Sequence, residues 1–232
     1  MHFTMARLAI IPARGGSKRI PRKNIRDFFG KPIIAYSIEV ALQSGLFDEV
    51  MVSTDDPEIA AIAKKYGAIV PFMRSSNNAN DMAATFDVLK EVEANYQQLY
   101  GLTFETICCI YPTAPLIKGQ KLVEGLDLLI KNNLDTVFPV VAFSYPVMRG
   151  LEIIDGKAKM IWPEYQNSRS QDLKEVYHDA GQWYWYRPEN IEKTLFTENS
   201  SCIILDPMEV QDIDQPADWL LAEMKFKLTS DK

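Results

Sequence analysis

The chain has 232 residues, of which 47% are hydrophobic and 24% charged, a balance typical of one folded domain with a substantial buried core. Its formal net charge of −6 argues against nucleic acid or a membrane surface as a partner. Only two histidines and three cysteines without a C-x-x-C pair argue against structural zinc, and with no signal-type N-terminus they favour a reducing, cytoplasmic setting.

Short apolar segments alternate with amphipathic ones over the first 141 residues, which predicts βαβ units, a largely parallel sheet and an α/β fold class. We expect strands at residues 8–11, 49–53, 69–71, 106–111 and 136–141. We expect helices at residues 32–45, with Pro32 in the first turn, and at 57–67, 86–99 and 119–132.

The pattern changes after residue 141. Residues 151–161, with Asp155-Gly156 at their centre, predict a β-hairpin. Two further strands, at 182–186 and 201–205, precede a C-terminal helix that carries Trp219. We interpret residues 143–175 as an insertion into a single domain that spans residues 1–232.

The loop after the first strand is strongly basic and contains Gly15-Gly16, whose backbone N–H groups can approach an anion closely. Its spacing matches neither a Walker A loop nor a dinucleotide fingerprint. On charge alone, phosphate binding competes with a plain solvated loop. Six cations lie within thirteen residues, with no acid among them: Arg14, Lys18, Arg19, Arg22, Lys23 and Arg26.

A resemblance decides between these readings. Residues 11–24, IPARGGSKRIPRKN, resemble the signature of the CMP-nonulosonate synthetases, the sialic-acid-type cytidylyltransferases, and the similarity continues over nearly the whole chain. It implies a Rossmann-like nucleotidyltransferase fold with a mixed, mainly parallel sheet, and a homodimer whose β-hairpin insertion reaches the partner subunit. It also implies that CTP and a nine-carbon 2-keto sugar acid give a CMP-sugar and pyrophosphate.

The same resemblance implies a nucleotide site. Arg14 and Lys23 are expected on the triphosphate and in catalysis. Segment 74–81 resembles the family's cytidine-binding segment, although Asp81 could simply cap the next helix. The remaining residues expected to contact the nucleotide are Ala13, Gly15, Gly16, Asn24, Arg74, Asn80 and Thr85.

Asp212-Ile213-Asp214 alternates two carboxylates around an apolar residue. On an extended segment both would face one side, an arrangement that suits Mg²⁺ with phosphate oxygens completing its shell. A helix-capping pair is the alternative. The family places an aspartate pair at this point, so we expect Mg²⁺ as the cofactor, bound by Asp212 and Asp214, with Asp214 as a catalytic residue.

We expect the sugar site at two segments, the end of the strand predicted at residues 106–111 and residues 177–185. Tyr111 stands where sialic acid enzymes have a glutamine that faces the sugar, which argues against sialic acid. Residues 177–185, YHDAGQWYW, resemble the branch of the family that activates pseudaminic acid. In that segment His178, Asp179 and Gln182 offer donors and acceptors to a sugar with two acylamino groups.

The sugar carboxylate requires a cation, and an arginine can bind it through two parallel hydrogen bonds. Arg169, upstream of the segment that resembles the pseudaminic acid branch, is our expected sugar ligand. Arg149 and Lys174 remain open for the carboxylate.

Three alternatives follow from the same residues. The first is the same reaction on sialic or legionaminic acid. The second is a glycosyltransferase that uses the aspartate pair, although such folds place their D-x-D motif mid-sheet. The third is an RNA-binding module that uses the basic loop, which the acidity of the rest of the chain disfavours.

Overall fold

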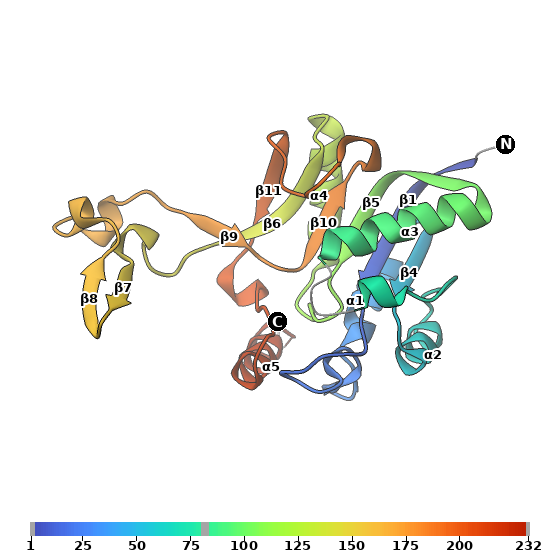
Figure 1. Cartoon of the computed structure of the whole chain (residues 1–232), viewed down its shortest axis with the longest axis horizontal. Helices are drawn as coiled ribbons and strands as arrows, with labels where there is room; N and C mark the ends of the chain where they lie inside the picture. The colour runs from blue at the N-terminus through green and yellow to red at the C-terminus, as the bar shows by residue number, and fades with distance from the viewer. Residues whose placement is uncertain (1–2, 80–83, 231–232) are drawn as a thin grey trace.

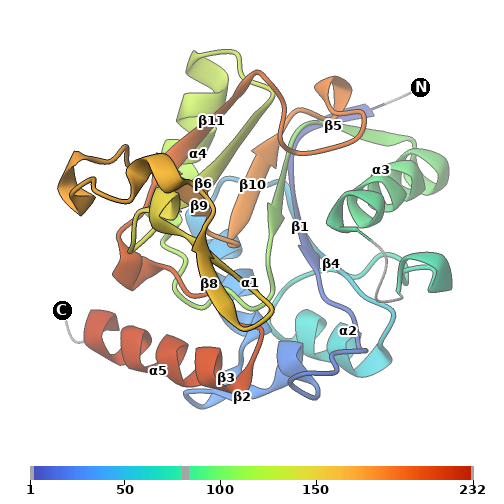
Figure 2. The ribbon, with the colours of Figure 1, turned by 60° about the vertical axis from the view of Figure 1, so that its left-hand side comes forward.

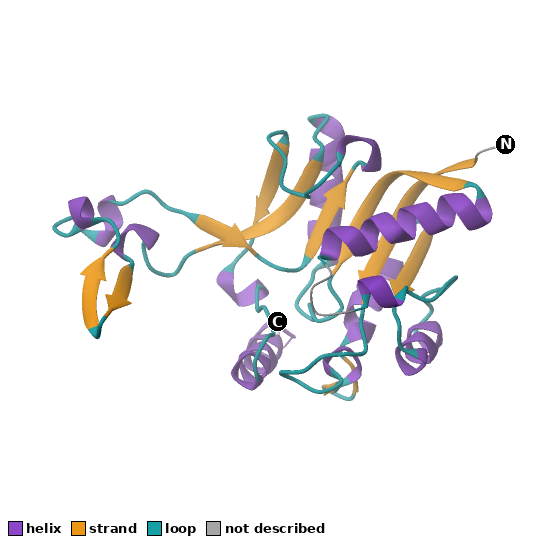
Figure 3. Ribbon diagram, viewed as in Figure 1, coloured by secondary structure: helices purple, strands orange, loops and turns teal. Residues whose placement is uncertain are grey.

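The computed structural model describes residues 3–79 and 84–230 and shows helices packed on both faces of one twisted sheet (Figures 1 and 3). The sheet has the strand order β11-β6-β10-β5-β1-β4, with β9 paired to β6. Strand β10 is antiparallel to both its neighbours, whereas the β1–β4, β1–β5 and β6–β11 pairs are parallel. The sheet is therefore mixed and mainly parallel, which confirms the predicted fold class. Its strands are β1 (Phe3–Pro12), β4 (Glu49–Ser53), β5 (Leu102–Ile110), β6 (Thr136–Ala142), β9 (Tyr177–Asp179), β10 (Trp183–Tyr186) and β11 (Ser200–Ile204).

Two cores lie on the two faces of this sheet. Ala9 and Ile11 of β1 pack with α1, α2 and α4, whereas Leu8 and Ile10 pack with α3. Because helices cover both faces, residues 8–11 of β1 are all apolar and buried, rather than apolar at alternate positions. The α-helices of the described residues are α1 (Ile34–Ser44), α2 (Pro57–Lys65), α3 (Thr85–Tyr100), α4 (Gly119–Lys131) and α5 (Pro216–Ser230).

A third, smaller core joins the end of the chain to its beginning. Helix α5 lies beside the short hairpin of β2 (Asp27–Phe28) and β3 (Lys31–Pro32), as Figure 2 shows. Trp219 of α5 and Ile213 just before it are buried with Ile20 and Phe28 from the segment after β1. This packing holds the Asp212–Asp214 segment against the basic loop.

An arm leaves the sheet after β6. It carries the hairpin of β7 (Leu151–Ile154) and β8 (Lys157–Met160), which Figure 1 shows projecting far from the sheet. Asp155 and Gly156 both have positive φ, 50° and 73°, as the central residues of a tight hairpin turn require. The chain returns as β9, antiparallel to the end of β6. The outgoing and returning segments of the arm are therefore hydrogen-bonded to each other.

Two predicted details were wrong. Residues 69–71 do not form a strand, because Ile69 makes only an isolated bridge to Met51 and Pro71 has no N–H with which to continue the pairing. Pro32 belongs to β3 rather than to the first turn of α1, since the positive φ of Phe29 turns the chain back so that Pro32 pairs with Asp27. None of the described helices combines the length and apolarity needed to cross a membrane.

Candidate functional site

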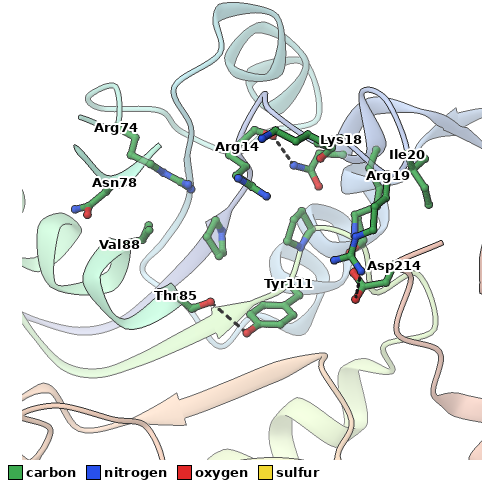
Figure 4. Close-up of a pocket in the computed structure, with 16 residues that line it drawn as sticks. Arg14, Lys18, Arg19, Ile20, Arg74, Asn78, Thr85, Val88, Tyr111 and Asp214 are labelled. Atoms are coloured by element: carbon green, nitrogen blue, oxygen red, sulfur yellow. Dashed lines mark hydrogen bonds and ion pairs between the residues drawn. The ribbon is translucent and has the colours of Figure 1, made fainter. Parts of the chain in front are cut away.

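A cavity of about 320 Å³ opens beside the basic loop, at the carboxyl ends of β1 and β5 (Figure 4). Ligands of α/β proteins bind at this end of the sheet, where the loops after parallel strands converge. Segments far apart in the chain contribute predicted residues to its wall: Arg14, Lys23, Asn24, Arg74, Thr85, Tyr111 and Asp214. Asn80 lies outside the described residues.

Acidic residues at the start of α2 hold the basic loop in place. Asp55 accepts a hydrogen bond from the backbone of Gly15 at 2.9 Å. Asp56 forms an ion pair with Arg22, whose backbone has a positive φ of 56°. That hydrogen bond from Arg22 lowers the pKa of Asp56. The sequence predicts this acidic pair only as a helix start, because nothing in the local pattern shows that it faces a loop about forty residues earlier.

Gly15 is needed because the loop approaches α2 closely. A Cβ atom at this position would lie 2.6 Å from Oδ2 and 3.0 Å from Cβ of Asp56, whereas one at Gly16 would meet nothing within 4 Å. Downstream, the side-chain amide of Asn24 donates to the carbonyl of Arg14 at 2.9 Å and closes the loop.

Asp214 lies beside cations of the basic loop at one edge of the cavity (Figure 4). Its carboxylate oxygens lie 3.2 Å from Nη1 of Arg19 and 3.7 Å from Nζ of Lys23. Lys23 also donates to the carbonyl of Ile213, so its ammonium group is held beside this segment. A carboxylate and several cations therefore meet at one place.

Asp212 precedes Asp214 in a segment outside the helices and strands, and Ile213 between them is fully buried. Asp214 lines the first cavity, whereas Asp212 lines a second one. Burial raises the pKa of Asp212, and the negative charge of the nearby Asp214 raises it further. A bound cation would relieve this repulsion. No preformed group of three metal-ligating His, Cys, Asp or Glu side chains is found within residues 3–79 and 84–230.

Arg74 forms one side wall and is itself 8% exposed. Its guanidinium donates to Oγ and to the carbonyl of Ser53, at 3.1 and 2.5 Å, which fixes it at the end of β4. Burial lowers the pKa of Arg74, and the nearby Asp55 and Glu91 oppose this effect.

Tyr111 and Thr85 close the cavity opposite the loop. The Tyr111 hydroxyl lies 3.3 Å from Oγ1 of Thr85 (Figure 4), and its ring packs against that of Tyr184, with the ring centroids 5.4 Å apart. Tyr184 in turn donates to Asp179. Burial, followed by the nearby Cys109, raises the pKa of Tyr111 to about 12, so the phenol is uncharged at neutral pH.

The predicted sugar residues other than Tyr111 are divided among three places. His178 and Asp179 line a second cavity of about 360 Å³, together with Asp212. Gln182 is 3% exposed, and its amide donates to the carbonyl of Glu209, so it joins β10 to the segment before Asp212. Arg169 lies in the arm and pairs with Asp172 at 2.7 Å, outside both cavities.

Comparison with known proteins agrees with this geometry. The sequence model of a family described as cytidylyltransferase matches residues 8–199. Pseudaminic acid cytidylyltransferase of Campylobacter jejuni is 42% identical over 230 residues, 97% of each chain. CMP-N,N'-diacetyllegionaminic acid synthase of Legionella pneumophila is 32% identical over 235 residues, also 97% of each.

Solved structures with low sequence identity share the fold. CMP:2-keto-3-deoxy-manno-octonic acid synthetase complexed with CTP has a TM-score of 0.66 at 20% identity, covering 98% of this chain and 100% of that one. The 4-diphosphocytidyl-2C-methyl-D-erythritol synthase of Anaerococcus prevotii has a TM-score of 0.65 at 15% identity, covering 96% and 98%. With a family match over most of its length and full-length relatives above 30% identity, the chain belongs to the cytidylyltransferase family.

Proposed function

We propose that the chain transfers the cytidylyl group of CTP to pseudaminic acid, giving the CMP-sugar and pyrophosphate. The observation that carries this proposal is the single cavity in which the basic loop faces Asp214. Full-length identity of 42% to a pseudaminic acid cytidylyltransferase supports the choice of sugar.

The basic loop is suited to hold the triphosphate. In the reaction the anomeric hydroxyl oxygen of the sugar bonds to the α-phosphorus, its proton is released, and the bond to pyrophosphate breaks. Both substrates are anions, so fixed positive charge must offset their repulsion and the charge that develops on the leaving group. We assign this role to Arg14 and Lys23, which line the cavity. Ala13, Gly15, Gly16 and Asn24 are proposed to support the nucleotide by shaping the loop. The N–H groups of Ala13 and Gly15 already donate to Ser53 and Asp55, and the amide of Asn24 donates to the carbonyl of Arg14.

Asp212 and Asp214 are suited to hold Mg²⁺. They supply the oxygen ligands that this ion prefers, they stand two residues apart, and their mutual repulsion favours a cation between them. When bound, Mg²⁺ supplies positive charge at the phosphate oxygens. Asp214, which already lies beside Lys23, is the carboxylate that we place nearest the reacting phosphate.

The cytidine is proposed to lie against the opposite wall. Arg74 and Thr85 line this part of the cavity, and Asn80 is assigned here by resemblance alone. Because Ser53 fixes the guanidinium of Arg74, this wall is rigid before the nucleotide arrives.

The sugar is proposed to bind between Tyr111 and the second cavity, where His178 and Asp179 offer polar groups. Gln182 supports this wall from behind through Glu209. Arg169 reaches a sugar carboxylate only if the arm of one subunit lies over the cavity of another, and such an arrangement needs a dimer.

We propose a homodimer formed through the arm. The hairpin of the arm exposes apolar side chains to water. The exposed fractions are 59% for Leu151, 69% for Ile153 and 49% for Ile154. Exposed apolar clusters of this kind mark contact surfaces. We also propose a cytoplasmic setting, since Cys108, Cys109 and Cys202 are all unpaired.

A coupled pyrophosphate assay tests the proposal. CTP, UTP and ATP are compared as donors, and pseudaminic, N,N'-diacetyllegionaminic and N-acetylneuraminic acids as acceptors. We expect pyrophosphate release with CTP and pseudaminic acid, and its loss in Asp214→Ala. Asp127→Ala, an exposed carboxylate on α4, is the matched control and should retain turnover. Preference for another sugar acid would reject pseudaminic acid, and full activity of Asp214→Ala would remove that residue from the mechanism.

A further inference from the structure

We infer that Lys225 and Gln182 are positioning residues that hold Asp212 in place as a ligand for a divalent cation. This inference rests on the proposed function, in which Asp212 and Asp214 bind Mg²⁺, and it adds a lysine of α5 to the residues on which that site depends. Both positioning residues act through the backbone of the segment that leads from β11 to Asp212.

The segment between β11 and α5 leads directly into Asp212. It contains one turn of 3₁₀ helix, Pro207–Glu209. Leu205 before this turn and Val210 after it are buried in one small core with Val141 of β6. Backbone carbonyls that lie outside the sheet and the α-helices need other hydrogen-bond partners when water cannot reach them.

Side chains from two other elements bind three carbonyls of this segment. The ammonium group of Lys225 on α5 donates to the carbonyl of Pro207 at 2.9 Å and to that of Val210 at 2.6 Å. The amide of Gln182, which directly precedes β10, donates to the carbonyl of Glu209. The segment is therefore held between the sheet and the C-terminal helix.

The partly buried position of Lys225 requires these hydrogen bonds. Burial lowers the pKa of Lys225, an effect that the negative charge of Asp206 opposes. A buried ammonium group is costly unless its N–H groups are bonded. Lys227 on the same helix is exposed and lies over the ring of Phe29 instead, 5.4 Å from its centroid. The two lysines therefore form a matched pair, of which only Lys225 binds the segment before Asp212.

Asp212 lies between two fixed points of the backbone. Upstream, Lys225 binds the carbonyl two residues before it. Downstream, Ile213 is fully buried and its carbonyl accepts a hydrogen bond from Lys23. The carboxylate of Asp212 is therefore kept near that of Asp214, although burial and the charge of Asp214 both raise its pKa. Groups that orient a metal ligand commonly change metal affinity by about 10–100-fold.

CTP binding in the absence of sugar tests this inference apart from turnover. Calorimetry gives the Kd of CTP once with Mg²⁺ and once with EDTA. Lys225→Met keeps the apolar stem but removes the donors, and we expect it to weaken CTP binding in Mg²⁺ about 10-fold. In EDTA the Kd should stay within about twofold of the wild type, because the basic loop is untouched.

Pyrophosphate release gives a second measurement. The Mg²⁺ concentration for half-maximal release should rise about 10-fold in Lys225→Met, and saturating Mg²⁺ should restore most of kcat. Gln182→Met, which removes the donor on the other side of the segment, should act in the same direction. Lys227→Met is the matched control and should leave both measurements unchanged.

A double-mutant cycle gives the decisive result. When Asp212 is already Asn, Lys225→Met should cause no further loss of CTP binding in Mg²⁺, because Lys225 acts through Asp212. Additive effects, or a loss in Lys225→Met that is as large in EDTA as in Mg²⁺, would overturn the inference while leaving the proposed function standing. A lower Tm of Lys225→Met with unchanged CTP binding in Mg²⁺ would overturn it as well.

Failure of the proposed function has a different signature. A wild type that binds CTP but releases no pyrophosphate with any of the sugar acids would reject the proposed reaction, whatever the Mg²⁺ dependence of the Lys225 variant.

Discussion

Replacing Gly15 by alanine tests how the basic loop is held. The new Cβ atom would lie 2.6 Å from Oδ2 and 3.0 Å from Cβ of Asp56, distances at which atoms must move. Asp56 is not free to move, because it accepts hydrogen bonds from the backbone of Glu58 at 2.9 Å and of Ile59 at 3.1 Å, and pairs with Arg22. Relieving this strain must therefore displace either the basic loop or the Asp56 side chain that caps α2, and either displacement lowers the stability of the protein.

The size of that cost follows from the contacts at risk. If Asp56 withdraws, α2 loses a cap worth about 1 kcal/mol. The partly exposed Arg22 pair adds roughly 0.2–1 kcal/mol. If the loop withdraws instead, the 2.9 Å bond between Gly15 and Asp55 breaks, at about 1 kcal/mol. The expected loss in the free energy of unfolding is about 1–2 kcal/mol, which corresponds to a fall in Tm of roughly 2–8 °C for a chain of this size.

Thermal unfolding and CTP kinetics measure the two consequences. A loop displaced by about 1 Å should also lower kcat/KM for CTP, by up to ~100-fold. Gly16→Ala is the control for stability, because a Cβ atom there meets nothing within 4 Å. Equal Tm values for the two variants, together with unchanged kcat/KM for CTP in Gly15→Ala, would refute the reasoning.

Three further predictions concern other parts of the molecule. Gly125→Ala should destabilise the protein by about 1–2 kcal/mol in urea unfolding, although alanine favours helices, since its Cβ atom would lie 2.5 Å from the ring of Trp183. Arg22→Ala should raise the midpoint of acid unfolding, followed by circular dichroism. The lowered folded pKa of Asp56 gives stability that is complete above about pH 4 and lost as pH falls through that lower value, and without Arg22 the loss begins at higher pH. Ile153→Asp should leave Tm of the subunit unchanged but shift sedimentation from dimer to monomer, because this side chain is 69% exposed.

Each of these predictions has a matched control. Gly119→Ala lies on the same helix, where the nearest atom to a new Cβ is at 3.7 Å, and should not destabilise the chain. Arg169→Ala breaks an exposed pair and should not move the acid midpoint. Leu99→Asp introduces the same charge on α3, at a side chain that is 57% exposed, and should leave the dimer intact. A control that behaves like its partner variant would contradict the stated cause.

Long elements of the fold could be predicted from the sequence. Residues 8–11 of β1 are a continuous apolar run and α4 carries a regular apolar stripe, so the apolar pattern alone identifies them. Strands β2, β3 and β9 have two or three residues each and carry no periodic signal. They exist because of their pairing partners, and pairing is a property of the folded chain.

The candidate site, like the fold, could be predicted from the sequence only in part. The charge of the basic loop and the carboxylates of Asp212 and Asp214 are visible in the sequence, because several groups of one kind stand close together. The contacts that hold them are not visible. Asp55 reaches Gly15, and the ring of Tyr184 packs against that of Tyr111, only because neighbouring strands of the sheet bring them together. The sequence predicts that the amide of Gln182 is available to a sugar. In the fold this amide donates to the carbonyl of Glu209 instead.

The paired entry and exit of the arm have a consequence for how such a protein can change over evolutionary time. Residues inserted or deleted beyond the β6–β9 ladder leave its register untouched, because the excursion begins and ends at adjoining residues, Ala142 and Tyr177. The arm can therefore be lengthened, shortened or exchanged as a unit while the basic loop and its supports stay as they are. A lineage built on this plan can change its arm without having to rebuild the cavity beside the basic loop.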